Sequence, residues 1–185
     1  GGRGIDGYGG RPIENATILI DGDRVAAVGR SSEIDLPAGT SVIDTQGMTV
    51  MPGLIDMHVH LHILGHGDYE RGDQLYRDRW VDTVMPIAAR QLLEAGVTAA
   101  RDLGGPPDAI LETKRRIAAG EIPGPRMFVS GPFLQQESYT EWERGYRWGT
   151  TSVVEARQTV QDLARRGVDV IKLIDQDQMQ PEVVE

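Results

Sequence analysis

Two histidines separated by a single residue, His58 and His60, carry the clearest chemical signal in this sequence. They lie in the apolar segment GLIDMHVHL, residues 53–61, which is typical of a buried β-strand. Side chains two positions apart on a strand share a face, about 6.6–6.8 Å apart, so both imidazoles can tilt onto one cation at ~2.0–2.1 Å. Unpaired imidazoles in an apolar strand are costly. We therefore predict that both are metal ligands; the alternative is a ring satisfied by a backbone carbonyl.

The two remaining histidines, His62 and His66, follow the same strand. His62 shares the face of the predicted ligand pair but lies beyond the expected strand end, so we predict a role beside the substrate. His66 is interpreted as an ordinary loop residue. Because the chain has no cysteine, disulfides and thiolate metal sites are excluded, and a metal must use imidazole, carboxylate or a rarer ligand.

A lysine in a second apolar segment, Lys172 in VDVIKLI (residues 168–174), extends this chemistry. A parallel strand covered by helices is buried on both faces, so an ammonium there is expected to be paired, deprotonated or modified. A neutral amine can react with CO₂ to form a carbamate, a carboxylate-like ligand that can bridge two cations. The alternative is a lysine that reaches solvent at the strand end or pairs with an acid such as Asp102.

Composition bounds the possible functions of the 185-residue chain. The formal net charge is −9 and no basic cluster stands out, which argues against nucleic-acid binding. No apolar run approaches the roughly 20 residues that a membrane span needs, so no membrane partner is expected. No signal peptide is visible, which favours a cytoplasmic location, although a chain that begins without Met leaves secretion open.

Residues 1–51 have the pattern of a small β domain. The segments 14–23 and 24–29 predict a hairpin around Asp21-Gly22-Asp23, and residues 41–51 predict two further short strands. The opening GGRGIDGYGG could instead cradle a phosphate. It lacks the required Lys-Ser/Thr pair and no helix follows it, so we reject that interpretation.

Residues 52–185 alternate predicted strands and helices. The strands are expected at 53–61, 97–103, 125–131 and 168–174, and the helices at 84–95, 106–120, 152–166 and from 180 onward. Ser152 and Glu155 form a capping-box pattern at the start of the third helix. Alternation of this kind indicates βαβ units and a parallel sheet, which is an α/β fold. Length alone would favour an open doubly wound sheet over a (β/α)₈ barrel, which needs about 250 residues.

The motif TVMPGLIDMHVHLH (residues 49–62) resembles the first barrel strand of the amidohydrolase superfamily. The segments GVTAARDLGG (96–105), GPRMFVSGPFL (124–134) and GVDVIKLI (167–174) resemble its next three strands, in order. The resemblance implies an incomplete small β-sandwich domain at 1–51, followed at 52–185 by the first four β/α units of a TIM-type barrel. Within the superfamily, a lysine on strand four resembles the branch of imidazolonepropionase-like enzymes and metal-dependent Xaa-Pro dipeptidases.

The resemblance also implies a cofactor and a division of roles. It implies a centre of two divalent ions, usually Zn²⁺, with His58 and His60 on the more buried ion and carboxylated Lys172 bridging both. The metals would activate a water and polarise the scissile carbonyl. The family pattern further requires histidines on strands five and six and a catalytic Asp on strand eight. No residue of this chain matches them, so the catalytic residue is expected beyond it.

The predicted function is metal-dependent hydrolysis of an amide or peptide bond in a small-molecule or peptide-like substrate, as in a dipeptidase. Three alternatives stay open: hydrolysis of a cyclic amide, a non-catalytic fragment that needs a complementary chain, and an open α/β binding domain without metal. The last would favour a Gly-rich or acidic loop after the first strand, where this chain has histidines. Half a barrel exposes unpaired edges, so a homo-oligomer or a complementary C-terminal half is the expected partner.

Two long segments and one acid complete the set of candidate residues. Asp102, at the end of the second predicted strand, is a candidate partner for a metal ligand or for Lys172. The segments 61–83 and 132–151, expected as loops, could hold a charged, peptide-like substrate or could form a solvated lid surface. Their candidates are Tyr69, Glu70, Arg71, Asp73, Tyr76, Arg77, Asp78, Arg79, Gln135, Gln136, Glu137, Tyr139, Trp142, Arg144 and Trp148.

Overall fold

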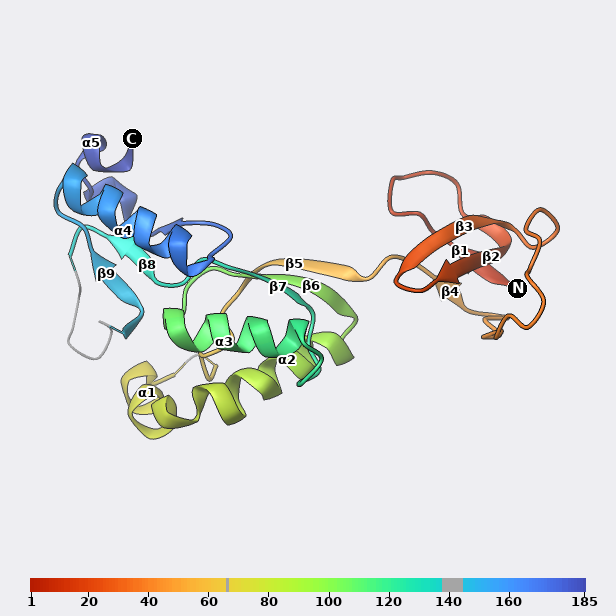
Figure 1. Ribbon diagram of the computed structural model, residues 1–185, viewed down its shortest axis with the longest axis horizontal. Helices are drawn as coiled ribbons and strands as arrows, with labels where there is room; N and C mark the ends of the chain where they lie inside the picture. The colour runs from red at the N-terminus through yellow and green to blue at the C-terminus, as the bar shows by residue number, and fades with distance from the viewer. Residues whose placement is uncertain (66, 138–144) are drawn as a thin grey trace. The chain divides into compact units, whose positions relative to one another are not determined.

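The computed structural model describes residues 1–65, 67–137 and 145–185 of the chain (Figure 1). The chain divides into two compact units, Gly1–Gly53 and Leu54–Glu185. The first unit consists of strands and turns, whereas the second alternates strands with helices. The predicted α/β class is confirmed.

The first unit is a four-stranded sheet in the order β3-β2-β1-β4. Its strands are β1 (Gly2–Gly4), β2 (Ile13–Asp21), β3 (Arg24–Arg30) and β4 (Thr49–Val50). The predicted hairpin is confirmed, since β2 and β3 pair antiparallel from Asp21↔Arg24 to Ala16↔Arg30. The turn needs Gly22, whose φ of +60° lies in the left-handed region where a side chain is disfavoured.

The ends of this sheet differ from the prediction. Only Thr49–Val50 forms a strand within residues 41–51, and it pairs parallel to β1. Val42 and Ile43 are 72% and 87% exposed, so these apolar residues are not buried in a sheet. The glycine-rich start contributes a strand, because residues 2–4 form β1. A Cβ on Gly2 would lie 2.3 Å from the carbonyl oxygen of Thr45, so this close approach requires glycine.

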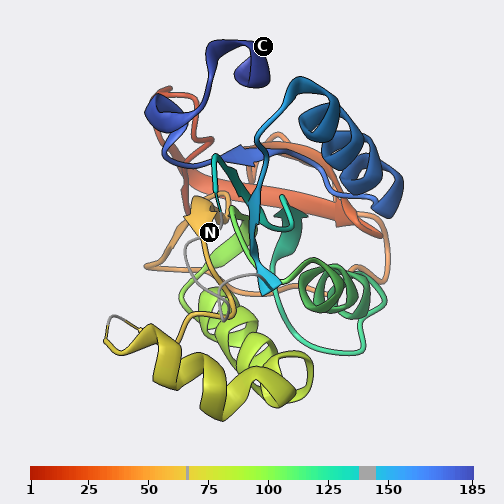
Figure 2. The same cartoon turned by 90° about the vertical axis from the view of Figure 1, so that its left-hand side faces the viewer.

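The second unit begins with the parallel sheet β5-β6-β7, which confirms the predicted strand and helix alternation. Strand β5 (Leu54–Val59) leads to β6 (Val97–Asp102) through helix α2 (Met85–Glu94), and β6 leads to β7 (Arg126–Val129) through α3 (Pro107–Ala118). Helices α2 and α3 lie side by side on one side of these strands in Figure 1. Figure 2, turned by 90°, shows the two helices again as neighbours.

A second parallel sheet, β10-β8-β9, continues the first beyond β7. Its strands are β8 (Phe133–Gln135), β9 (Arg147–Gly149) and β10 (Lys172–Leu173). The predicted strand at 125–131 corresponds to β7, which ends before Gly131 with its φ of +70°. Residues 132–151, expected to be loop, instead contain the strands β8 and β9. The segment after helix α4 (Val153–Arg166) contacts both β7 and β8. The N–H of Asp169 donates to the carbonyl of Val129 at 2.8 Å, and Lys172 pairs with Phe133. The two sheets do not close into a barrel.

Residues 69–83, expected to be loop, are helical. Helix α1 (Tyr69–Tyr76) is followed by the 3₁₀ turn η1 (Arg77–Arg79) and the π-helical turn η2 (Trp80–Val84), which runs directly into α2. The Asp68 carboxylate caps α1 by accepting from the N–H of Arg71 at 3.0 Å. Trp80 and Val84 are buried four residues apart, which is the helical period that the charged composition of the segment concealed.

The C-terminal helices agree with the prediction. Helix α4 (Val153–Arg166) begins at Ser152, whose hydroxyl accepts from the N–H of Glu155 at 3.3 Å, and it ends at Gly167 with φ +92°. The reciprocal bond of the capping box is displaced by one residue, since Glu155 accepts from the N–H of Thr151. A 3₁₀ turn η4 (Gln176–Gln178) precedes α5 (Pro181–Val184). No helix in the described ranges is long and apolar enough to span a membrane.

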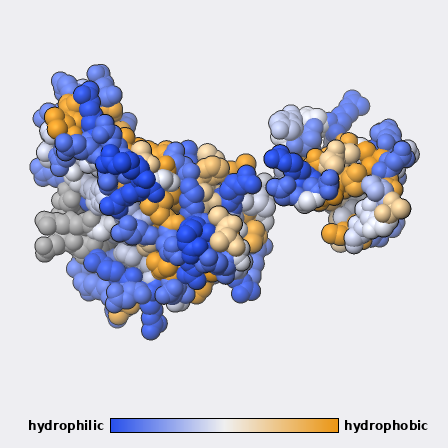
Figure 3. All heavy atoms as spheres, in the orientation of Figure 1, coloured by the Kyte–Doolittle hydropathy of each residue, from blue (hydrophilic) through white to orange (hydrophobic). Residues whose placement is uncertain are grey.

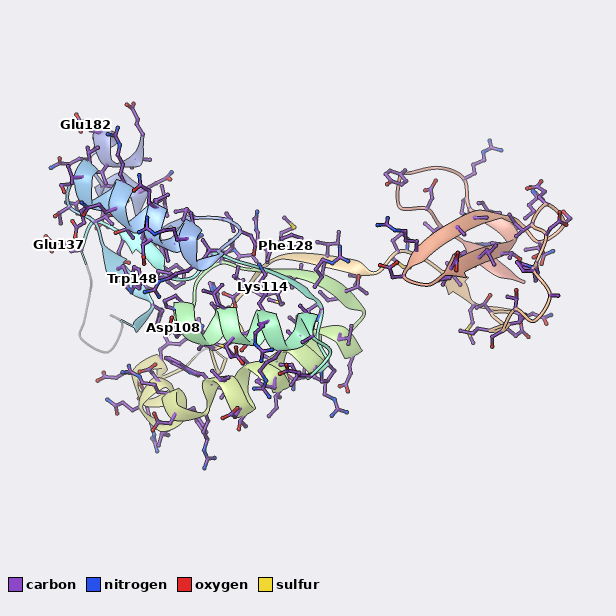
Figure 4. All side chains as sticks on the ribbon, in the orientation of Figure 1. Asp108, Lys114, Phe128, Glu137, Trp148 and Glu182 are labelled. Atoms are coloured by element: carbon purple, nitrogen blue, oxygen red, sulfur yellow. The ribbon has the colours of Figure 1, made fainter. Side chains whose placement is uncertain are left out.

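The core of the second unit lies between α2, α3 and the sheet. Met85, Ala89, Ile110 and Val129 are fully buried within it. Polar contacts tie the outer elements together: the Lys114 ammonium of α3 pairs with Asp169 at 2.7 Å. Lys114 is labelled in Figure 4.

Strand β5 contradicts the prediction of a buried strand. Leu54, Ile55 and Met57 are 50%, 66% and 51% exposed. The reason is that β5 pairs with β6 alone among the described strands, so its other edge and much of its surface have no neighbour. Figure 3 shows apolar surface on each unit.

The core assignment predicts unequal costs for two identical substitutions. Ile110→Ala should lower the free energy of unfolding by about 2–5 kcal/mol, because it opens a cavity at a fully buried position in α3. Ile87→Ala deletes the same atoms from α2 at a position that is 52% exposed, and should cost less than about 1 kcal/mol. Urea denaturation of both variants gives the comparison. Equal losses would contradict this placement of the core.

Candidate functional site

The predicted ligand pair lies at the end of β5. His58 occupies the strand and is exposed, whereas His60 follows the last strand residue, Val59, and is half-buried. Their Nε2 atoms are 3.2 Å apart, and the ring planes meet at 74°. The two imidazoles therefore converge on one point, as the spacing predicted.

This convergence fits a shared cation. Two nitrogens at ~2.0–2.1 Å from one ion, with a near-tetrahedral angle between them, lie about 3.1–3.4 Å apart. The same separation also suits a hydrogen bond in which the Nε2–H of His58 donates to Nε2 of His60. Among the described residues no cluster of three or more His, Cys, Asp or Glu side chains surrounds a single point. A further ligand in this part of the chain would have to be of another kind.

The orientation of His60 is set by the loop after β6. Its Nδ1 lies 3.0 Å from the carbonyl oxygen of Gly104, so Nδ1 carries the proton and Nε2 presents its lone pair. Gly104 has φ +148°, and a Cβ there would lie 2.3 Å from the ring of Phe133. Only glycine fits this position, and the ring that excludes a side chain also lies 5.3 Å from His60, centroid to centroid.

The electrostatic surroundings favour the neutral form of His60. Burial lowers the pKa of His60 most, and the hydrogen bond to Gly104 opposes this effect. The positive charges of His58, Lys172 and Arg147 lower that pKa further. A neutral imidazole is the form that can bind a metal.

Asp102 supports the same loop rather than Lys172. Its side chain is 1% exposed, and its two oxygens accept from the N–H of Leu61 at 2.8 Å and of Gly104 at 3.1 Å. Asp102 therefore joins the segment after β5 to the glycine whose carbonyl orients His60. Burial raises the pKa of this carboxyl to about 7, against the lowering effect of the two N–H donors.

Lys172 lies in β10, on the side of the sheet that faces His60. It pairs in parallel register with Phe133, whose ring contacts His60. The expectation of burial on both faces is wrong, since Lys172 is only half-buried. Its strand pairs with β8 alone among the described strands, so the second edge lacks cover. The ammonium has no hydrogen-bond or ion-pair partner in the described part of the chain.

His62 is buried rather than placed in an exposed loop. It is 5% exposed, and its ring lies 5.7 Å from Trp80, 4.7 Å from Tyr146 and 6.4 Å from His60, between centroids. Neither ring nitrogen has a hydrogen-bond partner in the described residues. Burial lowers the pKa of His62 to about 3. The role predicted for His62 beside the substrate is not tested by these contacts.

Some predicted residues fall outside the description, and others were missed. His66, Tyr139, Trp142 and Arg144 lie outside the described residues. Three residues near His60 were not predicted from the sequence: Gly104, Phe133 and Arg147. The guanidinium of Arg147 in β9 lies 5.0 Å above the ring of Phe133, and one of its nitrogens donates to Gln135 at 3.3 Å. The paired glycines after β6 were a visible sign of a close approach.

The second unit is thus a parallel α/β fold with two converging imidazoles at the end of its first strand. The family model for the amidohydrolase family matches residues 49–183, so the chain belongs to the amidohydrolase family. The imidazolonepropionase of Streptomyces avermitilis is 45% identical over 53 residues, which are 29% of this chain and 12% of that relative.

Solved structures show the same likeness over nearly the whole chain. Phenylurea hydrolase B aligns with a TM-score of 0.83 and 25% identity, covering 98% of this chain and 50% of that chain. A putative prolidase from Bifidobacterium longum aligns with a TM-score of 0.69 and 33% identity, covering 89% and 36%. This chain thus spans half or less of the structures that it matches.

The buried Asp102 predicts a specific pH dependence of stability. An unfolded carboxyl ionises above its usual pKa of 3.8, whereas folded Asp102 keeps its proton up to about pH 7. The folded state therefore holds the extra proton between these values, and stability falls as the pH rises. Replacing Asp102 by Asn removes this slope. The free energy of unfolding of the wild type, relative to that of Asp102→Asn, should therefore fall as the pH rises from 4 to 7.

The measurement is urea denaturation across this pH range with chelator present. Asp108→Asn is the matched control, because it removes a carboxylate whose side chain is 94% exposed. If wild type and Asp102→Asn run parallel from pH 4 to 7, the carboxyl is ionised throughout and its raised pKa is contradicted.

Proposed function

We propose that this chain contributes the first metal ligands of a metal-dependent hydrolase that cleaves amide or peptide bonds. The observation that carries this proposal is the 3.2 Å separation of the Nε2 atoms of His58 and His60. Membership of the amidohydrolase family supports the hydrolytic class.

In this proposal, the second unit is the first half of a (β/α)₈ barrel. The order β5, β6, β7 continued by β8, then β10 is the order of four successive barrel strands joined by α2, α3 and α4. The two candidate ligand segments then belong to the first and fourth strands, because His60 directly follows β5 and Lys172 lies in β10. Active sites of such barrels lie at the carboxyl ends of the strands.

The residues that would hold the metal are His58, His60 and Lys172. The imidazoles supply two nitrogens, and Lys172 supplies an oxygen ligand once its neutral amine adds to CO₂ and releases a proton. Two Zn²⁺ ions would be the cofactor that these three residues help to hold, with other divalent ions as alternatives. When bound, the metal centre activates water and polarises the substrate carbonyl. The catalytic acid–base is proposed to come from residues beyond those present here.

The chain's own groups prepare the site in three ways. Asp102 holds Gly104, and the Gly104 carbonyl keeps the Nε2 lone pair of His60 directed away from the loop. The ring of Phe133 lies against His60, and Lys172 pairs with Phe133 on the neighbouring strand. Arg147, above that ring, brings a positive charge to the same mouth.

The substrate is proposed to be a small amide or dipeptide. The likeness to a putative prolidase at 33% identity favours the dipeptide. The likeness to an imidazolonepropionase favours a cyclic amide as the second candidate. The uncovered edges of β5 and β10 support a partner for the sheet, either a complementary C-terminal half or another copy of the chain.

Zinc binding tests the ligand pair directly. Titration of the 185-residue chain with Zn²⁺ by calorimetry should show binding that falls on the order of 100-fold or more in His58→Ala and in His60→Ala, because each removes one of few ligands. His66→Ala is the matched histidine control and should bind as the wild type does. Absence of binding to the wild type, or an equal loss in all three variants, would contradict the proposed site.

Carboxylation of Lys172 has its own readout. With ¹³C-labelled bicarbonate and Zn²⁺, the chain should show a carbamate carbon signal by NMR that disappears in Lys172→Arg, since a guanidinium does not form this carbamate. The chain has one other lysine, Lys114, which pairs with Asp169, so Lys114→Arg is the matched control and should retain the signal. A signal that follows Lys114, or none at all, counts against Lys172 as the bridge.

A further inference from the structure

A small hollow beside His62 contains buried polar atoms that have no partner. It is formed by the segment between β5 and α1, by α1 itself, and by Trp80 and Tyr146. The residues whose chemistry matters are His62, Asp68, Asp73, Trp80 and Tyr146. Two of the lining residues carry buried polar atoms without a hydrogen bond in the described residues: both ring nitrogens of His62 and one oxygen of Asp73.

The imidazole of His62 needs a partner that both accepts and donates. A neutral imidazole offers one N–H and one lone pair, and leaving either unsatisfied in a buried position is unfavourable because the group has lost its hydrogen bonds to water. The side chain cannot turn to bulk solvent, because the rings of Trp80 and Tyr146 pack against it at 5.7 and 4.7 Å. A bound group in the hollow would remove this cost.

Asp73 presents a buried carboxylate oxygen to the same hollow. The side chain is 4% exposed, and its Oδ2 is held by the guanidinium of Arg77, one turn later in the helix. This ion pair fixes the direction of the carboxylate. Its Oδ1 is left as an acceptor with no donor among the described residues. An acceptor in this position requires a ligand that carries N–H or O–H groups.

The charge of the lining favours a cation. Two carboxylates, Asp68 and Asp73, line the hollow, and among the described residues no lysine or arginine does. Arg77 offsets Asp73 through its ion pair, which leaves the carboxylate of Asp68, while the positive charge of Arg147 also acts on His62. The aromatic rings of Trp80 and Tyr146 add faces that attract a positive group.

We propose that this hollow is the subsite that binds a protonated primary amine of the substrate. The ammonium donates to Oδ1 of Asp73 and to the free nitrogen of His62, and it lies against the aromatic wall. This assignment rests on the proposed hydrolase function, which it sharpens by naming the substrate class: amides or dipeptides that carry an ammonium group.

The distance from the metal ligands is compatible with one substrate reaching both places. The rings of His62 and His60 are 6.4 Å apart between centroids. An extended residue spans roughly 3.3–3.6 Å, so the ammonium would sit one to two residue lengths from the bond that is hydrolysed. A terminal amino group or a short amino side chain meets this condition.

The test is an NMR titration of the 185-residue chain with methylammonium chloride, with sodium acetate as the second arm, at constant ionic strength and with chelator present. Methylammonium should shift the indole N–H of Trp80 and the ring nitrogens of His62 with saturation at a Kd on the order of 10 mM, as expected for two heavy atoms. Acetate should cause no saturable shift. Saturation by acetate instead would show that Arg147 makes the hollow an anion site, and would overturn the proposal.

Two shape-preserving variants assign the contacts. Asp73→Asn removes the acceptor charge and His62→Phe removes the ring nitrogens, so each should weaken methylammonium binding at least about 5-fold. Asp82→Asn removes a carboxylate that is 82% exposed and should leave the Kd unchanged. Undiminished binding in both variants, with their native spectra retained, overturns the assignment.

The outcome separates this inference from the proposed function. Zinc binding through His58 and His60 is measured without amine, and methylammonium binding is measured without metal. If the chain binds zinc but shows no methylammonium shift, only the amine subsite is contradicted. If it shows the methylammonium shift but does not bind zinc, only the metal site is contradicted.

Discussion

The hydrogen bond between Nδ1 of His60 and the Gly104 carbonyl is the constraint on which the rest of the candidate site depends. It selects the tautomer whose Nε2 can converge with that of His58. The carbonyl is in place because Asp102 accepts from the N–H of the same glycine, and because no side chain separates Gly104 from Phe133. Strands β5 and β8 and the loop after β6 thus together orient the Nε2 atom of His60.

The spacing of residues alone was sufficient to predict the convergence of side chains that are close in sequence. The His-x-His pair lies on one strand, so its convergence follows from the two-residue period of a β-strand. The alternation of strands and helices likewise gave the parallel sheet. Lys172 could be singled out because an ammonium in an apolar strand is unusual, although its half-exposed position depends on which strand lies beside it.

The remainder depends on contacts between distant segments. The role of Asp102 is fixed by N–H groups in two different loops, which no local pattern encodes. The helical segment after His62 was hidden because its apolar residues are few and its charges many, so Trp80 and Val84 were not recognised as one buried face. The boundary between β7 and β8 coincides with the positive φ of a single glycine, Gly131.

The continuous helical run from α1 through η1 and η2 into α2 limits where the chain can tolerate mutations. Asp73 and Trp80 belong to the same helical run as Met85 and Ala89, which are fully buried in the core. A mutation that shifts Asp73 or Trp80 therefore also shifts residues on which folding depends. Substitutions in β9 should disturb the core less, because Arg147 and Trp148 are only half-buried.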